Sequence, residues 1–286
     1  MGRAGDSVKF EPRVQGEYTS RQTEAAHRVL IDLGQVLASF EDCLVLVGGS
    51  VPDLLIIGAD EPHVGSIDID LALDTEKLAQ GHYAKLIESL LKTGHYHQAE
   101  EPFKLYAEVD IEDGEGQIRV DVDFLKSPEA KIKKNKPKLI KGFRPLDVIG
   151  CETVLRNPVV LERKGKMING AENTVEVRVA ALPDFLIMKA YALSKRDKPK
   201  DAYDLCYCLD YCPGGVGVIV SDWRDRSDDK HVRKATEILT KKFESVESFG
   251  PRQVVEFYDS GDAERKAGEA RRAYELVQRF LESLKT

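Results

Sequence analysis

Two short segments, in which aspartate alternates with aliphatic residues, constrain the fold more than any other feature of the chain. The segment "SIDIDLAL" contains Asp68 and Asp70, and the segment "QIRVDVDFL" contains Asp121 and Asp123. Because residues i and i+2 of a β-strand point to the same face, each segment predicts a strand with one apolar face and one acidic face. We therefore expect a sheet in which carboxylates gather on one surface.

This acidic face has two interpretations. Carboxylates that converge from neighbouring strands repel one another unless a positive charge lies among them, and Mg²⁺ prefers oxygen ligands of this kind. The alternative is a strand face that is simply solvated. Aspartate is disfavoured in strands, so its repetition on two strands makes coincidence less likely, and both interpretations stay open at this point. Asp121 and Asp123 share a face, and spacing alone does not choose between them as a third metal ligand.

A glycine-rich turn precedes the first acidic segment. The stretch "LVLVGGS" predicts a buried strand that leads through Gly48 and Gly49 to Ser50 and the start of a helix. Glycines let the backbone approach a phosphate, and the free N–H groups of a helix start attract anions. A tight turn without a ligand is the commoner explanation of this short pattern. Its spacing is neither G-x-G-x-x-G nor a P-loop.

Two helices are predicted in the first third of the chain. Apolar residues at helical spacing predict one helix from Thr19 or Ser20 to about Phe40. A second helix is predicted with Thr75 as its cap and Gly94 as its stop.

The middle of the chain predicts strands and the rest predicts helices. "IEDGEG" lies between "FKLYAEVD" and "QIRVDVDFL", which indicates a β-hairpin. Two further strands are predicted over 158–168 and 173–182, and helices follow. We expect three parts: an N-terminal helical segment (1–40), a sheet-containing domain (41–180) and a helical C-terminal domain (181–286).

Charge is distributed unevenly along the chain. The formal net charge is −7. Residues 126–144 nevertheless hold eight basic side chains against one acidic side chain, and residues 189–200 hold five against one. An acidic protein with two basic tracts is suited to bind a polyanion locally. A tract such as "KIKKNKPKLIK" is usually just solvated, but here it is also the best candidate for contacting a nucleic-acid backbone.

Composition excludes some classes of protein. No run of about 18 apolar residues is present, so we expect no transmembrane helix. The first twenty residues are polar, and we expect no secretory signal. The five cysteines are scattered and show no zinc or disulfide spacing, which favours buried thiols in a reducing cytoplasm.

The order of these features resembles the nucleotidyltransferase fold of the DNA polymerase β superfamily. "GGS", "DID" and "RVD" match its Gly-Ser turn, its Asp-x-Asp strand and its third carboxylate, in that order. The resemblance implies an α/β (α+β) fold, with a mixed sheet flanked by helices and then a helical domain. It implies that Asp68 and Asp70 bind two Mg²⁺ ions (or Mn²⁺), that Asp121 is the third ligand, and that residues 48–50 hold phosphates.

A second stretch looks like the C-terminal motif of the AbiEii-type toxin nucleotidyltransferases. In "MKAYALSKRDKPKDAYDL" the matching residues are Lys189, Arg196, Lys198, Lys200, Asp201, Asp204 and Leu205. This resemblance covers roughly residues 40–210. It implies that Lys189 and Arg196 neutralise a triphosphate and that Asp204 orients a cation or activates the acceptor. The alternative for this stretch is a solvated helix–loop–helix whose charges lie at the surface.

The resemblance implies that a nucleoside monophosphate moves from an NTP to a hydroxyl and that pyrophosphate is released. The implied acceptor is RNA, namely a tRNA 3′ end, and the implied partner is an antitoxin. Ser66 and Lys200 join the nucleotide-binding residues, whereas Val64 stands near the place where family members often carry arginine. One alternative is an enzyme that modifies a small molecule such as an antibiotic. The other is a nucleotide-binding regulator without turnover.

Overall fold

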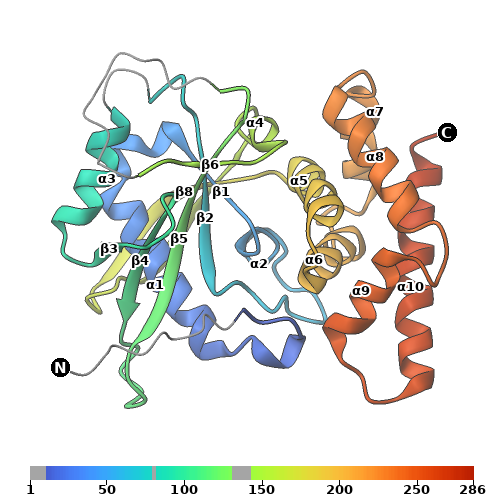
Figure 1. Cartoon of the computed structure of the whole chain (residues 1–286), viewed down its shortest axis with the longest axis horizontal. Helices are drawn as coiled ribbons and strands as arrows, with labels where there is room; N and C mark the ends of the chain where they lie inside the picture. Colours follow the sequence, from blue (N-terminus) through green and yellow to red (C-terminus); the bar gives the residue numbers. More distant parts are fainter. Residues whose placement is uncertain (1–10, 79–81, 131–142) are drawn as a thin grey trace.

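A mixed sheet of eight strands forms the centre of the protein, as the computed structural model shows (Figure 1). The structure describes residues 11–78, 82–130 and 143–286. The order across the sheet is β3 (Tyr96–Gln98), β4 (Lys104–Val109), β5 (Ile118–Lys126), β2 (Asp68–Leu73), β1 (Leu44–Val47), β8 (Glu172–Val179) and β7 (Val159–Lys166), and β6 (Leu146–Asp147) pairs with β5. The predicted α/β class, the hairpin and the two later strands are confirmed.

The two acidic strands are neighbours. β2 pairs with β5 in parallel, so that Asp68 lies opposite Asp121 and Asp70 lies opposite Asp123. The alternate residues, such as Ile69 at 1% exposure, are buried in the core. The period-two alternation therefore predicted both the strands and the faces correctly.

Helices cover both faces of the sheet. They are α1 (Ser20–Val36), α2 (Ser50–Leu55), α3 (His82–Lys92), α4 (Cys151–Val154), α5 (Leu182–Lys195), α6 (Pro199–Asp210), α7 (Gly217–Asp225), α8 (Lys230–Lys242), α9 (Phe249–Tyr258) and α10 (Ala263–Ser283). Figure 1 shows α1 and α3 on one side of the sheet and α5 and α6 on the other, with α7 to α10 beyond them. The three predicted parts stay a prediction, although α1 packs directly against the sheet.

The helices at the sheet differ from the prediction at their ends. The Thr19 side chain caps α1 as expected. However, α1 ends at Val36 rather than near Phe40, because the hydrogen bonds tighten into a 3₁₀-helix over Ala38–Cys43. The second predicted helix does not start at Thr75. Asp74 accepts hydrogen bonds from two following backbone N–H groups, which makes a turn there, and the described helix begins at His82.

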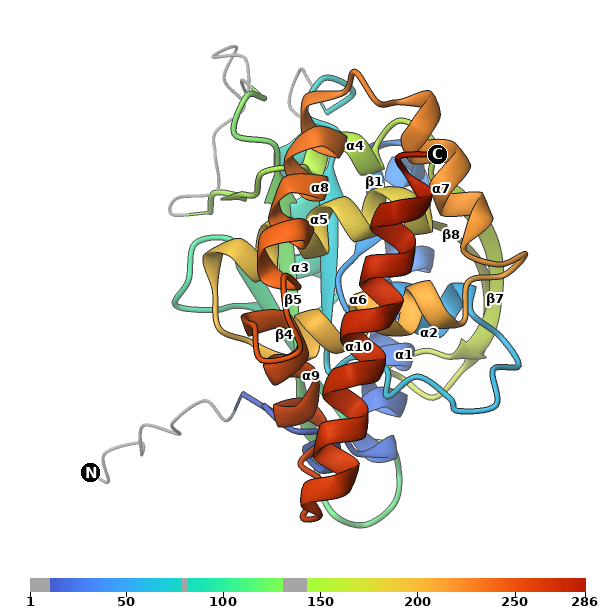
Figure 2. The same ribbon diagram turned by 90° about the vertical axis from the view of Figure 1, so that its right-hand side faces the viewer.

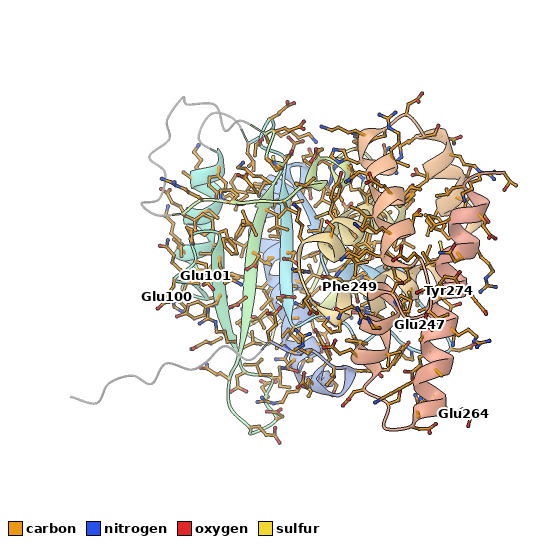
Figure 3. The ribbon with its side chains drawn as sticks, turned by 45° about the vertical axis from the view of Figure 1, so that its right-hand side comes forward. Glu100, Glu101, Glu247, Phe249, Glu264 and Tyr274 are labelled. Carbon is orange, nitrogen blue, oxygen red and sulfur yellow. The ribbon has the colours of Figure 1, made fainter. Side chains whose placement is uncertain are left out.

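The C-terminal helices pack against α5 and α6, with α7 and α8 on α5 and with α9 and α10 on α6. Figure 2 shows α10 running across the outer surface in front of α6. Residues 199–209 of α6 are all buried, which includes Cys206 and Cys208. In Figure 3, Glu100 and Glu101 mark the edge of the sheet, and Tyr274 lies on the opposite, helical side. No described helix is long and apolar enough to cross a membrane. Residues 131–142 of the predicted basic tract lie outside the described residues.

Candidate active site

The glycine turn lies directly beside the Asp-x-Asp pair. Val47, the last residue of β1, is opposite Asp70 in the antiparallel β1–β2 ladder. Gly48 follows with φ of +75°, and a Cβ atom there would overlap the Asp70 carboxylate. Ser50 then begins α2 and is buried. The structure therefore brings together the two motifs that the sequence separates by 17 residues.

The two carboxylates of the pair have different environments. The Ser66 hydroxyl donates to Asp68 Oδ1 at 2.6 Å. Burial alone would raise the pKa of Asp68, but Lys198 and the Ser66 hydrogen bond together lower it. Burial and the charges of Asp68 and Asp123 raise the pKa of Asp70 to about 7. The pair is thus an anionic site that a cation would stabilise.

The second acidic strand is already matched by basic side chains. Lys104 Nζ lies 3.1 Å from Asp121 Oδ2 and 2.7 Å from Asp123 Oδ1. Arg119 Nε donates to Asp121 Oδ1 at 2.9 Å. The structure places Asp121 next to Asp68, as predicted for a third ligand. Lys104, which the sequence analysis did not single out, lies between the two carboxylates of this strand.

A buried ionic network faces the turn from α5 and α6. Lys189 Nζ lies 2.8 Å from Asp201 Oδ1 and 2.7 Å from Asp204 Oδ2, and Lys200 Nζ donates to Asp204 Oδ1 at 2.7 Å. Arg196 binds Asp201 through two hydrogen bonds of 2.6 and 2.8 Å. Asp204 is 0% and Asp201 is 1% exposed. The alternative of a solvated helix–loop–helix with surface charges is therefore wrong.

Residue His63 completes this network and was missed by the sequence analysis. The Gly65 N–H donates to His63 Nδ1 at 3.0 Å, so the ring proton is on Nε2, which donates to Asp204 Oδ1 at 2.9 Å. Burial and the Lys200 charge lower the pKa of His63, and the ring is neutral. The position of His63 just before the Ser-x-Asp-x-Asp segment was the available signal.

The sheet motifs and the ionic network meet at Gly49. A Cβ atom on Gly49 would lie 2.7 Å from Lys200 Nζ and 2.9 Å from Ser66 Oγ. The Arg196 side chain is 54% exposed, and its positive charge lowers the pKa of Asp70. The positive charge of Lys198 lowers the pKa of Asp68. The candidate site therefore lies between the sheet and the α5–α6 connection, with carboxylates on one side and cations on the other.

The donor set suits a divalent cation shared with a substrate. Among the described residues, no three His, Cys, Asp or Glu side chains are grouped closely enough to hold a metal ion by themselves. Asp68 and Asp70 offer carboxylate oxygens on one strand face, where burial and the charges of Asp68 and Asp123 raise the pKa of Asp70. Mg²⁺ is commonly bound by one or two carboxylates with phosphates and water. The residues fit that mode of binding.

Two solved structures are similar to the chain over most of its length. The chain resembles JHP933 from Helicobacter pylori, with 13% identity over 93% of this chain and 94% of that chain and a TM-score of 0.47. It also resembles an antigenic nucleotidyltransferase-like protein from Paracoccidioides brasiliensis, with 13% identity over 76% and 94% of the two chains and a TM-score of 0.40. No curated protein matches the chain significantly.

The family assignment comes from a sequence profile that spans most of the chain. The family described as "Nucleotidyl transferase AbiEii toxin, Type IV TA system" matches residues 31–259. This range runs from within α1 to the end of α9 and contains both the sheet motifs and the ionic network. The protein therefore belongs to the AbiEii family of toxin nucleotidyltransferases.

Proposed function

We propose that this nucleotidyltransferase moves a nucleoside monophosphate from an NTP to a hydroxyl of an RNA acceptor, with a tRNA 3′ end as the expected acceptor, in a Mg²⁺-dependent reaction. The observation that carries the proposal is the opposition of charges across the site. Asp68 and Asp70 lie on the sheet, and Arg196 and Lys198 lie across from them on the α5–α6 connection. A metal-bound triphosphate needs both kinds of group.

The triphosphate is held between the turn and the cations. The backbone at Gly48 and Gly49 can approach a phosphate closely because neither residue has a side chain. Asp68 and Asp70 would hold the divalent cation, which neutralises charge on the phosphates when it is bound. Arg196 is partly exposed beside Asp70 and is placed to neutralise phosphate charge. NTP should consequently bind weakly when EDTA removes the metal.

Lys189 and Asp204 act through other residues in this proposal. The family resemblance implies that Lys189 neutralises charge on the triphosphate. In the structure Lys189 is 7% exposed and lies between Asp201 and Asp204. Asp204 in turn fixes Lys200, which lies under Gly49. We therefore assign Lys189 and Asp204 to the positioning of the turn and of Lys200.

A nucleic-acid acceptor is favoured by the exposed cations around the carboxylates. Lys195 and Arg196 are exposed at the end of α5, and Lys198 is half-buried just beyond it. Arg119 lies on β5 beside Asp121, and its side chain is 47% exposed. Such a rim can contact phosphates of an RNA strand while its 3′ hydroxyl enters the site. An antitoxin is the expected partner, because the family is defined by toxins of toxin–antitoxin systems.

The proposal is tested by incubating the protein with Mg²⁺, each α-labelled NTP and one of three acceptors: total RNA, tRNA or an aminoglycoside. We expect label on tRNA, no label in EDTA, and none with Asp70→Asn. Label on tRNA that has an oxidised 3′ end would contradict the assignment of the hydroxyl. Transfer to the aminoglycoside alone would support a small-molecule acceptor instead. Nucleotide binding without any transfer would support a regulatory protein.

A further inference from the structure

We infer that Lys104 supplies a fixed positive charge at the acceptor side of the site, where a second metal ion would otherwise lie, so that the enzyme holds one divalent cation per active site. This inference rests on the proposed function. It replaces the expectation, drawn from the superfamily resemblance, that Asp121 helps to bind a second ion.

The backbone register fixes the position of Lys104. β4 pairs antiparallel with β5, and Lys104 lies directly opposite Asp123. Asp123 in turn lies opposite Asp70 on β2. Residues that are opposite one another in a ladder share a face, so Lys104 belongs to the same face as the Asp-x-Asp pair. Its placement follows from three adjacent strands and not from the rotamer of one long side chain.

The ammonium group bridges the two carboxylates of β5. Lys104 Nζ lies 2.7 Å from Asp123 Oδ1 and 3.1 Å from Asp121 Oδ2, and the Lys104 side chain is 7% exposed. A buried ammonium is stable only when carboxylates compensate its charge. The charge of Lys104 is therefore fixed at β5, the strand that pairs with the proposed metal ligands of β2.

A second metal at Asp121 would have to share a carboxylate that the Lys104 ammonium already contacts. In two-metal sites the ions lie about 3.5–4 Å apart and are held by shared carboxylates. A second divalent ion at Asp121 would therefore lie next to the Lys104 ammonium and would be repelled by it. Arg119 adds a further positive charge at Asp121 Oδ1. The two acidic strands thus have different roles in this proposal. β2 binds the metal ion that carries the NTP, and β5 holds Lys104 next to that metal site.

The experiment counts bound Mn²⁺ directly. Electron paramagnetic resonance titration in the presence of a non-hydrolysable NTP analogue measures the number of ions per chain without any turnover. We expect one ion per chain for the wild type. Lys104→Met removes the ammonium but keeps an unbranched side chain, and we expect this variant to bind two ions. Lys104→Gln is a second neutral variant, and thermal unfolding verifies that each variant is folded.

Arg119→Met is the matched control. It removes the other cation that contacts Asp121 but leaves Lys104 between the two carboxylates, so we expect it to bind one ion. Two ions in the wild type would overturn the inference and leave the proposed function intact. One ion in both Lys104 variants would also overturn it, because Lys104 would not be what excludes the second. No NTP-dependent Mn²⁺ binding by the wild type would overturn the proposed function itself.

Discussion

Replacement of Asp204 by asparagine tests whether the buried ionic network supports the fold. Asn has nearly the same shape as Asp, so Asp204→Asn removes a charge without leaving a cavity. Lys189 keeps Asp201 as a partner at 2.8 Å. Lys200 does not, because Asp204 is the one carboxylate within ion-pair distance of it among the described residues. The variant therefore buries an ammonium group without a carboxylate in ion-pair contact.

The expected loss of stability follows from the burial of Asp204 and Lys200. Lys200 is 4% exposed and Asp204 is 0% exposed. Removing one partner of a buried ion pair costs about 3–5 kcal/mol. For a chain of this size, 1 kcal/mol corresponds to about 2–4 °C in melting temperature. We expect Asp204→Asn to lower the free energy of unfolding by about 3–5 kcal/mol and the melting temperature by roughly 6–20 °C.

The assay is thermal unfolding in EDTA without nucleotide, which separates stability from binding. Asp210→Asn is the control on the same helix, because Asp210 pairs at 2.5 Å with Arg272, whose side chain is 63% exposed. Exposed pairs contribute about 0–1 kcal/mol, so this control should melt close to the wild type. A melting temperature for Asp204→Asn within 2 °C of the Asp210→Asn control would refute the reasoning.

Three further predictions concern the turn, the metal ligand and the exposed arginine. Gly49→Ala should reduce nucleotide transfer and lower the free energy of unfolding by about 1–3 kcal/mol through overpacking, because its Cβ atom would press on Lys200. Gly268→Ala, on the open surface of α10, is the control. It should stabilise the protein by about 0.5–1 kcal/mol. Equal melting curves for the two variants would contradict this prediction. The folded pKa of Asp70 is about 7 against an ordinary 3.8, so the metal-free folded state retains a proton that the unfolded state releases. Its stability should fall as the pH rises from 4 to 7, by about 2–4 kcal/mol; Asp70→Asn should abolish this slope in melts at pH 5 and pH 8, and an unchanged slope would show that another group causes it. Arg196→Met should raise the KM for NTP about 10- to 100-fold, as expected for the loss of a charge-assisted phosphate contact, with little change in kcat; steady-state kinetics would disprove this if only kcat fell.

The sequence predicted the parts of the site that depend on local pattern. Alternation of apolar and acidic residues placed Asp68 and Asp70 on one strand face, and the hairpin signal placed the second acidic strand. The period of a strand is two, so these assignments need no knowledge of the tertiary fold. Helix ends were predicted less well. The Asp74 side chain binds the backbone that was expected to be helical, because aspartate competes for N–H groups in turns.

The side-chain partners could not be predicted in the same way. His63 and Asp204 are 141 residues apart in the sequence, and no spacing rule connects them. The position of Lys104 could have been predicted from the sequence, because the register of the hairpin places it opposite Asp123. The burial of Lys189 and Lys200 could not be predicted from the sequence either, because a run of charges in a polar stretch normally indicates a solvated surface.

The distribution of the site over two distant parts of the chain sets the time at which a newly made molecule becomes active. Synthesis completes the four aspartates of the sheet first, and another 81 residues must be added before Asp204 is in the chain. At about 5–20 residues per second, this interval lasts roughly 4–16 s. During that time the nascent sheet has neither the cations of the α5–α6 connection nor the network that holds Lys200. If the proposed site is correct, we expect a ribosome-bound chain to stay inert until α6 has emerged and docked. Another molecule could then bind the exposed acidic face before any nucleotide is transferred.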